Sequence, residues 1–191
     1  MTTSHTGRPL RRNAAANRQR ILAAAEAVFG AHGALGSTED VAAQAGVGIA
    51  TVFRHYATKE ALIEAALLRH FDRLHEQADT LGAHADPADA LQQLLATMID
   101  TGATKLTLAS RVGARGELPP NVRTAAEDLR RAMNVVLDRA KTAGVVRAGV
   151  TVDEVYVLIR GLAQATATMP PPPATLSGAV DIIWRGIARS R

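Results

Sequence analysis

Apolar residues recur along this chain at intervals of three and four, the spacing that places side chains on one face of an α-helix. Ile21, Leu22, Ala25, Val28 and Phe29 show the pattern near the start of the chain. We find no stretch in which apolar and polar residues alternate as in a half-buried strand, and no internal repeat. Aromatic residues make up only 3% of the chain, so aliphatic residues and alanine, a strong helix former, must fill the core. The sequence therefore predicts an all-α fold.

Start and stop signals divide the chain into separate helices. Residues 37–40 and 151–154 each match a capping box, in which a hydroxyl side chain begins a helix and an acid follows three positions later. Asp86, followed directly by a proline, predicts another start, and the helical pattern after it is first interrupted around residue 115. The four prolines at 170–173 must end one helix before the last one begins.

The segment 37–59 predicts two short helices joined by a tight turn. Gly46 can adopt the positive φ that such a turn requires, and the second helix is expected over Ile49–Tyr56. Short helices are marginal alone, so small apolar residues must pack both against the preceding helix. The outward face of the second helix would then present Thr51, Arg54 and His55. Such a helix can enter the major groove of DNA, although an ordinary helical corner is the alternative.

The first 25 residues contain five arginines and no acid. Residues 1–13 lack periodicity and are expected to form a flexible basic arm, for which a merely solvated tail is the alternative. Phosphate contacts, which give salt-dependent affinity without sequence information, would come from Arg8, Arg11, Arg12, Arg18 and Lys59. Thr51 and Arg54 are the candidates for base contacts.

Several other classes of protein are disfavoured. The chain has no cysteine, which excludes disulfides, zinc ribbons and thiol nucleophiles. Gly46-Val47-Gly48 resembles the start of a nucleotide-binding loop but follows a helix, and His70 and His75 are not spaced as a zinc protease needs. We therefore expect no enzyme, no cofactor and no metal site. Without a signal peptide or a long apolar run, the expected location is the cytoplasm, with no membrane partner.

The N-terminal third resembles the TetR family of transcriptional regulators. The matching residues are Ile21 to Ala24, Phe29, Gly33, Thr38, Val41-Ala42 and Ala45 to Val47, followed by Thr51 to Tyr56 and Lys59 to Leu62. The match covers about 45 residues in order and without gaps. It implies an N-terminal three-helix helix-turn-helix DNA-binding domain over residues 14–60 and a C-terminal helical ligand-binding and dimerisation domain over residues 61–191.

The resemblance implies a set of DNA contacts around the turn. These are Ser37, Thr38, Gly48, Ile49, Ala50, Thr51, Phe53, Arg54, His55 and Lys59. Phe53 stands where the family commonly has a tyrosine, so a hydroxyl contact to phosphate is lost. Ile49 is apolar where many members are polar, and it would meet a thymine methyl group.

The resemblance also assigns roles in the C-terminal part. The last two helices would form the dimer interface, through Gly161, Val180, Ile183, Trp184 and Ile187. The central helices would line a ligand pocket, through Leu95, Met98, Thr101, Thr104, Met133, Leu137 and Leu162. Completion of the monomer core is the alternative for both sets. Because aromatic residues are scarce and no buried charge pair is evident, the expected ligand is apolar and of modest size.

The functional hypothesis is a repressor that binds a palindromic operator on double-stranded DNA as a homodimer and is released by an unknown small-molecule effector. The two DNA-binding domains of the dimer, about 34–36 Å apart, would contact the two half-sites. A DNA-binding regulator without a ligand, and an activator, remain as alternatives.

Overall fold

The computed structural model describes residues 7–113 and 117–189, which form nine α-helices and one short 3-10 helix, η1 (Gly33–Leu35). The α-helices are α1 (Gly7–His32), α2 (Thr38–Ala45), α3 (Ile49–His55), α4 (Lys59–Gly82), α5 (Pro87–Asp100), α6 (Gly102–Val112), α7 (Pro120–Thr142), α8 (Val152–Thr168) and α9 (Pro173–Ile187). The described residues form no strand, and a β-bridge joins Val146 to Ala188. The predicted all-α fold is confirmed.

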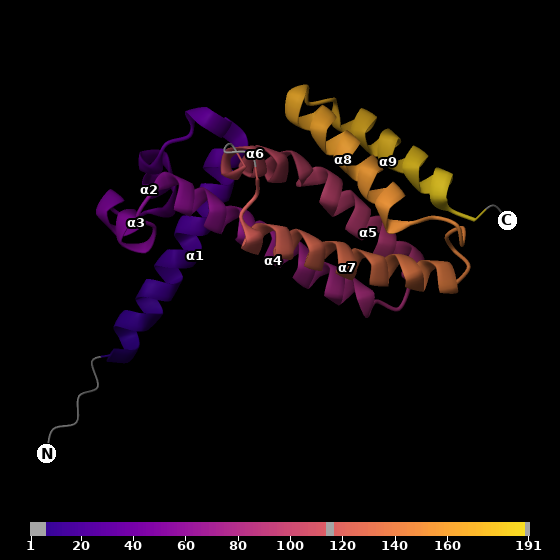
Figure 1. Ribbon diagram of the computed structural model, residues 1–191, viewed down its shortest axis with the longest axis horizontal. Helices are drawn as coiled ribbons and strands as arrows, with labels where there is room; N and C mark the ends of the chain where they lie inside the picture. Colours follow the sequence, from indigo (N-terminus) through magenta and orange to yellow (C-terminus); the bar gives the residue numbers. More distant parts are fainter. Residues whose placement is uncertain (1–6, 114–116, 190–191) are drawn as a thin grey trace, which may run out of the picture.

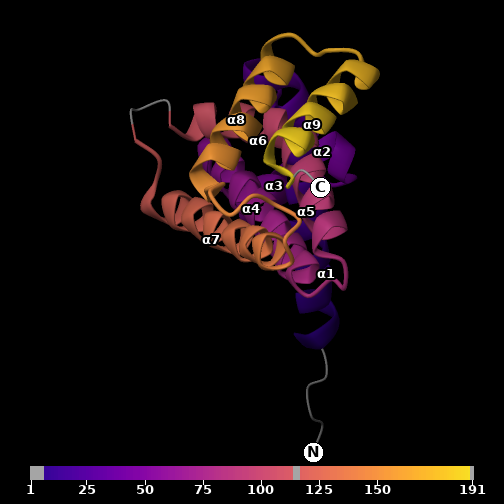
Figure 2. The same cartoon turned by 90° about the vertical axis from the view of Figure 1, so that its right-hand side faces the viewer.

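The helices form two groups that share α4. α1, α2 and α3 lie at one end of the molecule, and α8 and α9 lie side by side towards the other (Figure 1). α4 packs against α1 in the first group and against α7 in the second, while α6 contacts α1, α4 and α8. Seen from the side, the α8–α9 pair again lies together and above α7 (Figure 2). The central helices α4 and α6 therefore connect the two ends.

A continuous apolar core runs through both groups. Phe29, Leu62, Leu67, Leu94 and Met133 are among its largest fully buried side chains. Each such side chain contributes about 1.5–3 kcal/mol through burial, so this core is the main source of stability. No helix within residues 7–113 and 117–189 combines the length and the apolar character needed to cross a membrane.

The N-terminal helix is longer than the sequence predicted. α1 begins at Gly7, so the prediction of a flexible arm is wrong for residues 7–13, and residues 1–6 of that arm lie outside the described residues. The physical reason is local: Pro9 falls in the first turn, where its missing N–H costs no helical hydrogen bond. The alanines at 14–16 and the neighbouring arginines then favour helix.

The predicted helix starts are confirmed in detail. Oγ of Ser37 accepts a hydrogen bond from the N–H of Asp40 at 3.0 Å. Asp86 caps α5, and Thr151 forms the second capping box at the start of α8. These side chains satisfy N–H groups that have no partner within the helix.

One helix boundary has no clear signal in the sequence. The pattern that begins at residue 87 is divided into α5 and α6 at Thr101, well before the interruption near residue 115. α6 packs against α8 so closely that a Cβ added to Gly102 would lie 2.4 Å from the Cβ of Ala163. The chain therefore changes direction between α5 and α6 where α6 contacts α8. The local sequence allows this change but does not require it.

Candidate nucleic-acid interface

The turn between α2 and α3 depends on the backbone of Gly46. This residue has φ 64° and ψ 39°, a left-handed conformation that side chains with a Cβ rarely adopt. Its N–H donates to the carbonyl oxygens of Ala42 and Ala43, and the N–H of Val47 donates to Ala42 at 3.0 Å. The glycine thus ends α2 and redirects the chain into α3, as the sequence predicted.

The start of α2 is fixed by the capping box of Ser37 and Asp40. Oδ2 of Asp40 accepts hydrogen bonds from the backbone N–H of Ser37 at 3.1 Å and from its hydroxyl at 2.6 Å. The hydroxyl of Ser37, then its backbone N–H, holds the pKa of the Asp40 carboxyl below its usual value. Asp40 is therefore ionised when it caps the helix.

The two short helices each bury one face, α2 against α1 and α3 against α2. Val41, Ala42 and Ala45 of α2 and Val52 of α3 belong to the core cluster that contains Phe29. Val52 is completely buried, so α3 cannot rotate without exposing it. This packing supplies the stability that helices of eight and seven residues lack in isolation.

The opposite face of α3 lies open to solvent. Ile49 is 37% exposed and Phe53 is 45% exposed, although both are large apolar residues. Gly48, Ala50 and Arg54 are exposed, and Thr51 and His55 are half-buried. The predicted DNA contacts at residues 48–51 and 53–55 therefore leave an exposed surface on this helix, which we call the α3 face.

Two predicted DNA contacts, Thr38 at the start of α2 and Lys59 at the start of α4, already make hydrogen bonds within the chain. The Nζ of Lys59 donates to the carbonyl oxygen of Gly36 and lies 5.5 Å from the ring centroid of Phe29. Thr38 is buried, and its hydroxyl donates to Glu39 at 3.1 Å. A lysine ammonium has three N–H groups, so Lys59 retains donors for a phosphate while it holds this loop in place.

Two arginines of α1 lie near the turn and α3. The exposed Arg20 has its Nη1 3.8 Å from the position that a Cβ on Gly46 would take. Sequence reasoning did not include Arg20 among the DNA contacts, although its place next to the apolar stripe at Ile21 could have indicated it. Burial raises the pKa of the Tyr56 hydroxyl. The exposed Arg18 lies close enough for its charge to oppose that rise.

A charged cluster joins α1 to α4. Glu26 of α1 is 6% exposed, and its carboxylate accepts from Nη1 of Arg69 at 2.5 Å and from Nη1 of Arg73 at 2.7 Å. His70 on the same helix is 3% exposed, and burial, followed by the charges of Arg73, Lys105 and Arg69, lowers its pKa to about 4. The assumption that the chain has no buried charge pair was wrong.

The predicted pocket residues lie in or beside the core. Leu95, Met98, Met133 and Leu137 are almost fully buried, and the other three are half-buried. Thr104 packs against α1, where a Cβ added to Gly30 would lie 2.7 Å from its Cγ2. The cavities described below are lined by other residues, so this set stays a prediction.

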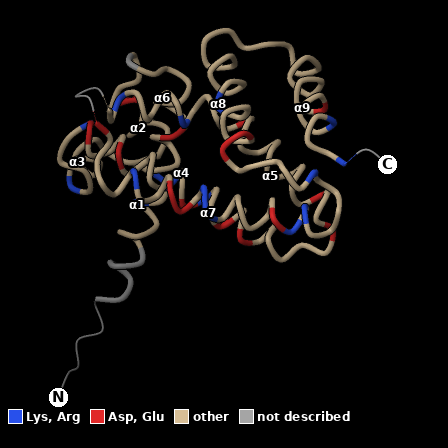
Figure 3. Tube along the Cα trace, turned by 45° about the vertical axis from the view of Figure 1, so that its right-hand side comes forward, with Lys and Arg blue, Asp and Glu red and all other residues tan. Residues whose placement is uncertain are grey.

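The α8–α9 pair carries the exposed apolar surface of the C-terminal part. Val157 is 68% exposed and Ile182 is 71% exposed. No charged residue occurs between Arg160 and Asp181, and Figure 3 shows this stretch of α8 and α9 uncharged, whereas charges of both signs lie along α7. We call the outward side chains of α8 and α9 the α8–α9 face.

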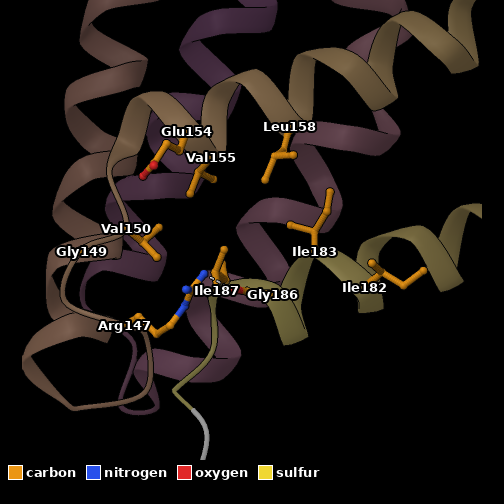
Figure 4. Close-up of a pocket in the computed structure, with 10 residues that line it drawn as sticks. All are labelled: Arg147, Gly149, Val150, Glu154, Val155, Leu158, Ile182, Ile183, Gly186 and Ile187. Carbon is orange, nitrogen blue, oxygen red and sulfur yellow. Dashed lines mark hydrogen bonds between the residues drawn. The ribbon is translucent and has the colours of Figure 1, made fainter.

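The predicted dimer residues fall partly on this face. Ile183 lines a cavity of about 560 Å³ between α8, α9 and the preceding loop (Figure 4). Gly161 is exposed, and Val180 and Trp184 are half-buried. Ile187 instead belongs to the chain's own core, because its carbonyl accepts from the N–H of Arg147 and holds the end of α9 inward. A smaller cavity of about 350 Å³ lies between α5 and α9.

Two packed short helices, a left-handed glycine turn and an exposed second helix define a helix-turn-helix transcriptional regulator. Comparison with known proteins agrees. Residues 21–66 match the family model described as bacterial regulatory proteins of the tetR family, and residues 86–189 match the model described as the C-terminal domain of SbtR-like transcriptional regulators. The chain belongs to the TetR family of transcriptional regulators. No curated protein sequence matches it significantly.

Solved structures support the assignment over the whole chain. A TetR transcription regulatory protein from Mycobacterium vanbaalenii is 30% identical with a TM-score of 0.76, covering 95% of this chain and 100% of its own. A TetR transcriptional regulator from Streptomyces coelicolor is 29% identical with a TM-score of 0.78, covering 91% and 99%. The ketosteroid transcriptional regulator of Mycobacterium tuberculosis, at 23% identity and a TM-score of 0.62 over 91% and 95%, shares the fold.

Proposed function

We propose that this TetR-family regulator is a repressor that binds a near-palindromic operator as a homodimer and is released by a small-molecule effector. The observation that carries the proposal is the α3 face. Val52 is fully buried, Ala50 and Arg54 are exposed on the opposite side of the same helix, and Ile49 and Phe53 beside them are also exposed. A short helix held in this way presents apolar and basic groups to a groove wide enough to admit it.

The candidate contacts divide by function. Arg54 and Thr51 on the α3 face would contact base edges, where an arginine pairs with guanine and carries sequence information. Ile49 and Phe53 would meet thymine methyl groups or sugars. Ser37, Thr38 and Lys59, which cluster at the start of α2, together with Arg18, would contact phosphates and set the register without discriminating between sequences.

Dimerisation is supported by the α8–α9 face. A contiguous exposed apolar patch on a folded chain marks an interaction surface, and an uncharged stretch suits the buried centre of such a surface. A self-complementary contact of α8 and α9 with their copies would give a two-fold dimer. Two α3 faces would then read two half-sites about one helical turn apart.

The effector would act by changing the distance between the two DNA-binding domains of the dimer. We assign DNA binding to residues up to 60 and ligand binding and dimerisation to residues from 61, with α4 continuous across the boundary. Because α4 packs on α1 at one end and on α7 further along, a shift of α4 would move the DNA-binding domain. A ligand changes DNA affinity only if it binds the two arrangements differently.

Selection of bound sequences from random double-stranded DNA tests the proposal directly. The expected result is a consensus with two-fold symmetry, whose affinity falls steeply with salt because phosphate contacts release counterions. Recovery of no consensus, together with no binding at low salt, would refute the function. Reporter expression with the operator placed at a promoter then separates a repressor from an activator.

Three arginine variants test the division of contacts. Arg54→Ala should weaken operator binding about 10- to 100-fold and reduce discrimination against random DNA, as expected for loss of a base contact worth about 1–3 kcal/mol. Arg18→Ala should weaken binding to both DNAs by the same factor. Arg131→Ala, which removes an exposed arginine of α7 paired with Asp128, should leave both affinities unchanged.

A further inference from the structure

The side chain of Lys105 on α6 is a buried cation without an acidic partner. Lys105 is 7% exposed, and lysine is seldom buried to this extent unless it is paired. Its Nζ donates to the hydroxyl of Tyr156 at 3.2 Å and lies 5.0 Å from the centroid of that ring. Within residues 7–113 and 117–189, no carboxylate lies within 4.0 Å of Nζ, and the remaining residues include no aspartate or glutamate.

The neighbouring charges do not compensate Lys105. Glu26, the buried acid of this region, is already shared by Arg69 and Arg73. His70 on α4 stays neutral near neutral pH, and its Nε2 is buried without a hydrogen-bond partner. A neutral hydroxyl and a ring face stabilise an ammonium much less than an anion does in a medium of low dielectric constant. The site therefore has a positive charge that a bound anion would neutralise.

We infer that Lys105 and Tyr156 bind the carboxylate of the effector, which is an organic acid with an apolar body. This inference rests on the proposed function, because it names the class of ligand that would release the DNA. One free ammonium matches a single negative charge. Leu108 on α6 and Ile159 on α8, one turn from these two residues, are fully buried and would contact an apolar body rather than a second charged group.

The location of the site links such a ligand to the DNA-binding end. Lys105 is nearly buried, so a carboxylate reaches it only when α6 and α8 move apart locally. α6 is packed tightly at two glycines, Gly102 against Ala163 of α8 and Gly30 of α1 against Thr104. The contact of Thr104 with Gly30 leaves no room for α6 to move away from α8 and towards α1 alone. Displacement of α6 by a ligand would therefore be passed to α1 and to the helices it carries.

Thermal unfolding of the full chain with carboxylates provides the test. The probes are straight-chain acids from acetate to decanoate and benzoate, each compared with its primary amide at constant ionic strength and neutral pH. The expected result is that at least one acid raises the Tm and its amide does not. The same acid should weaken binding to the selected operator. If no acid raises the Tm beyond its amide, the inference is wrong.

Two variants separate binding from structure. Lys105→Met keeps an unbranched side chain one atom shorter and removes the charge, so it should abolish the response to acids while its own Tm equals or exceeds that of the wild type. Tyr156→Phe should weaken the response about three- to tenfold, as for loss of one hydrogen bond. A Tm of Lys105→Met more than about 4 °C below the wild type would show a structural role and overturn the inference.

Failure of this inference and failure of the proposed function give different results. If operator selection succeeds and acids have no effect, the DNA-binding function stands and the effector assignment falls. If acids stabilise the wild type but not Lys105→Met, while no operator is found, the ligand site stands and the regulatory function falls.

Discussion

Nη1 of Arg69 on α4 lies 2.5 Å from Oε1 of Glu26 on α1, and Arg73 contacts the second oxygen of the same carboxylate at 2.7 Å. The two arginines are one helical turn apart, so they hold the carboxylate from one face of α4. The contact ties the helix that carries the DNA-binding end to the helix that enters the C-terminal part. Any movement of α1 relative to α4 must strain or break it.

Glu26→Gln should lower the free energy of unfolding by about 1–3 kcal/mol. The amide keeps the shape but loses the charge, and the cost is moderated because the Arg73 side chain is 53% exposed. Chemical denaturation measures the change. The matched control is Asp153→Asn, which removes an exposed ion pair with Arg130 and should cost less than about 1 kcal/mol. Equal losses in the two variants would contradict a special role for the Glu26 cluster.

Gly46→Ala should destabilise the chain by about 1–2 kcal/mol, the cost of a left-handed conformation for a residue with a Cβ. Its Cβ would meet nothing closer than 3.8 Å, so the effect comes from the backbone rather than from a clash. Operator affinity should fall further, because a distorted turn misplaces α3. Gly82→Ala, at the helical end of α4 with open space around it, should instead be neutral or stabilising by up to about 1 kcal/mol.

The buried imidazole of His70 predicts a dependence of stability on pH. In the folded chain its pKa is lowered to about 4 from 6.5, mainly by burial. Between pH 4 and pH 6.5 the unfolded chain binds more protons at this group than the folded chain does. The contribution of neutral His70 to the free energy of unfolding is therefore fully present above pH 6.5 and is lost as the pH falls towards 4. The loss approaches about 3 kcal/mol for this one group.

His70→Gln removes this titration and should flatten the difference between the stabilities at neutral and acid pH. His75→Gln is the matched control, because His75 lies on the same helix but its side chain is 41% exposed. Urea denaturation of the three proteins over this pH range provides the comparison. A pH profile of His70→Gln identical to that of the wild type would show that His70 is not the group responsible.

The sequence predicted those features that depend on neighbouring residues. Ser37 with Asp40, Thr151 with Glu154 and the glycine at 46 act within a few positions, so their types alone indicated helix starts and the turn. The exposed α3 face followed from the burial of Val52 on the other side. These signals were sufficient for the fold and for the position of the candidate DNA contacts.

Features that depend on distant residues could not be predicted in this way. Glu26 and Arg69 are 43 positions apart, and nothing local distinguishes them from solvent-exposed charges. Lys105 lies in a helix where a lysine ordinarily indicates the exposed face, yet packing of α6 between α4 and α8 buries it. The division between α5 and α6 likewise accompanies the contact of Gly102 with Ala163 rather than a strong local breaker.

If the chain dimerises through the α8–α9 face as proposed, Ile182→Glu should convert the dimer to a monomer at micromolar concentration. Ile182 is 71% exposed on α9 and is proposed to be buried by the partner's α8–α9 face, where an unpaired carboxylate would lose its hydration. Val135→Glu is the matched control, since Val135 is 56% exposed on α7 and lies outside that face. Sedimentation velocity distinguishes the species, and affinity for the palindromic operator should fall with the loss of the dimer while binding to a half-site persists. A wild-type chain that sediments as a monomer would contradict the proposed dimer, whereas an Ile182→Glu variant that remains dimeric would place the interface elsewhere.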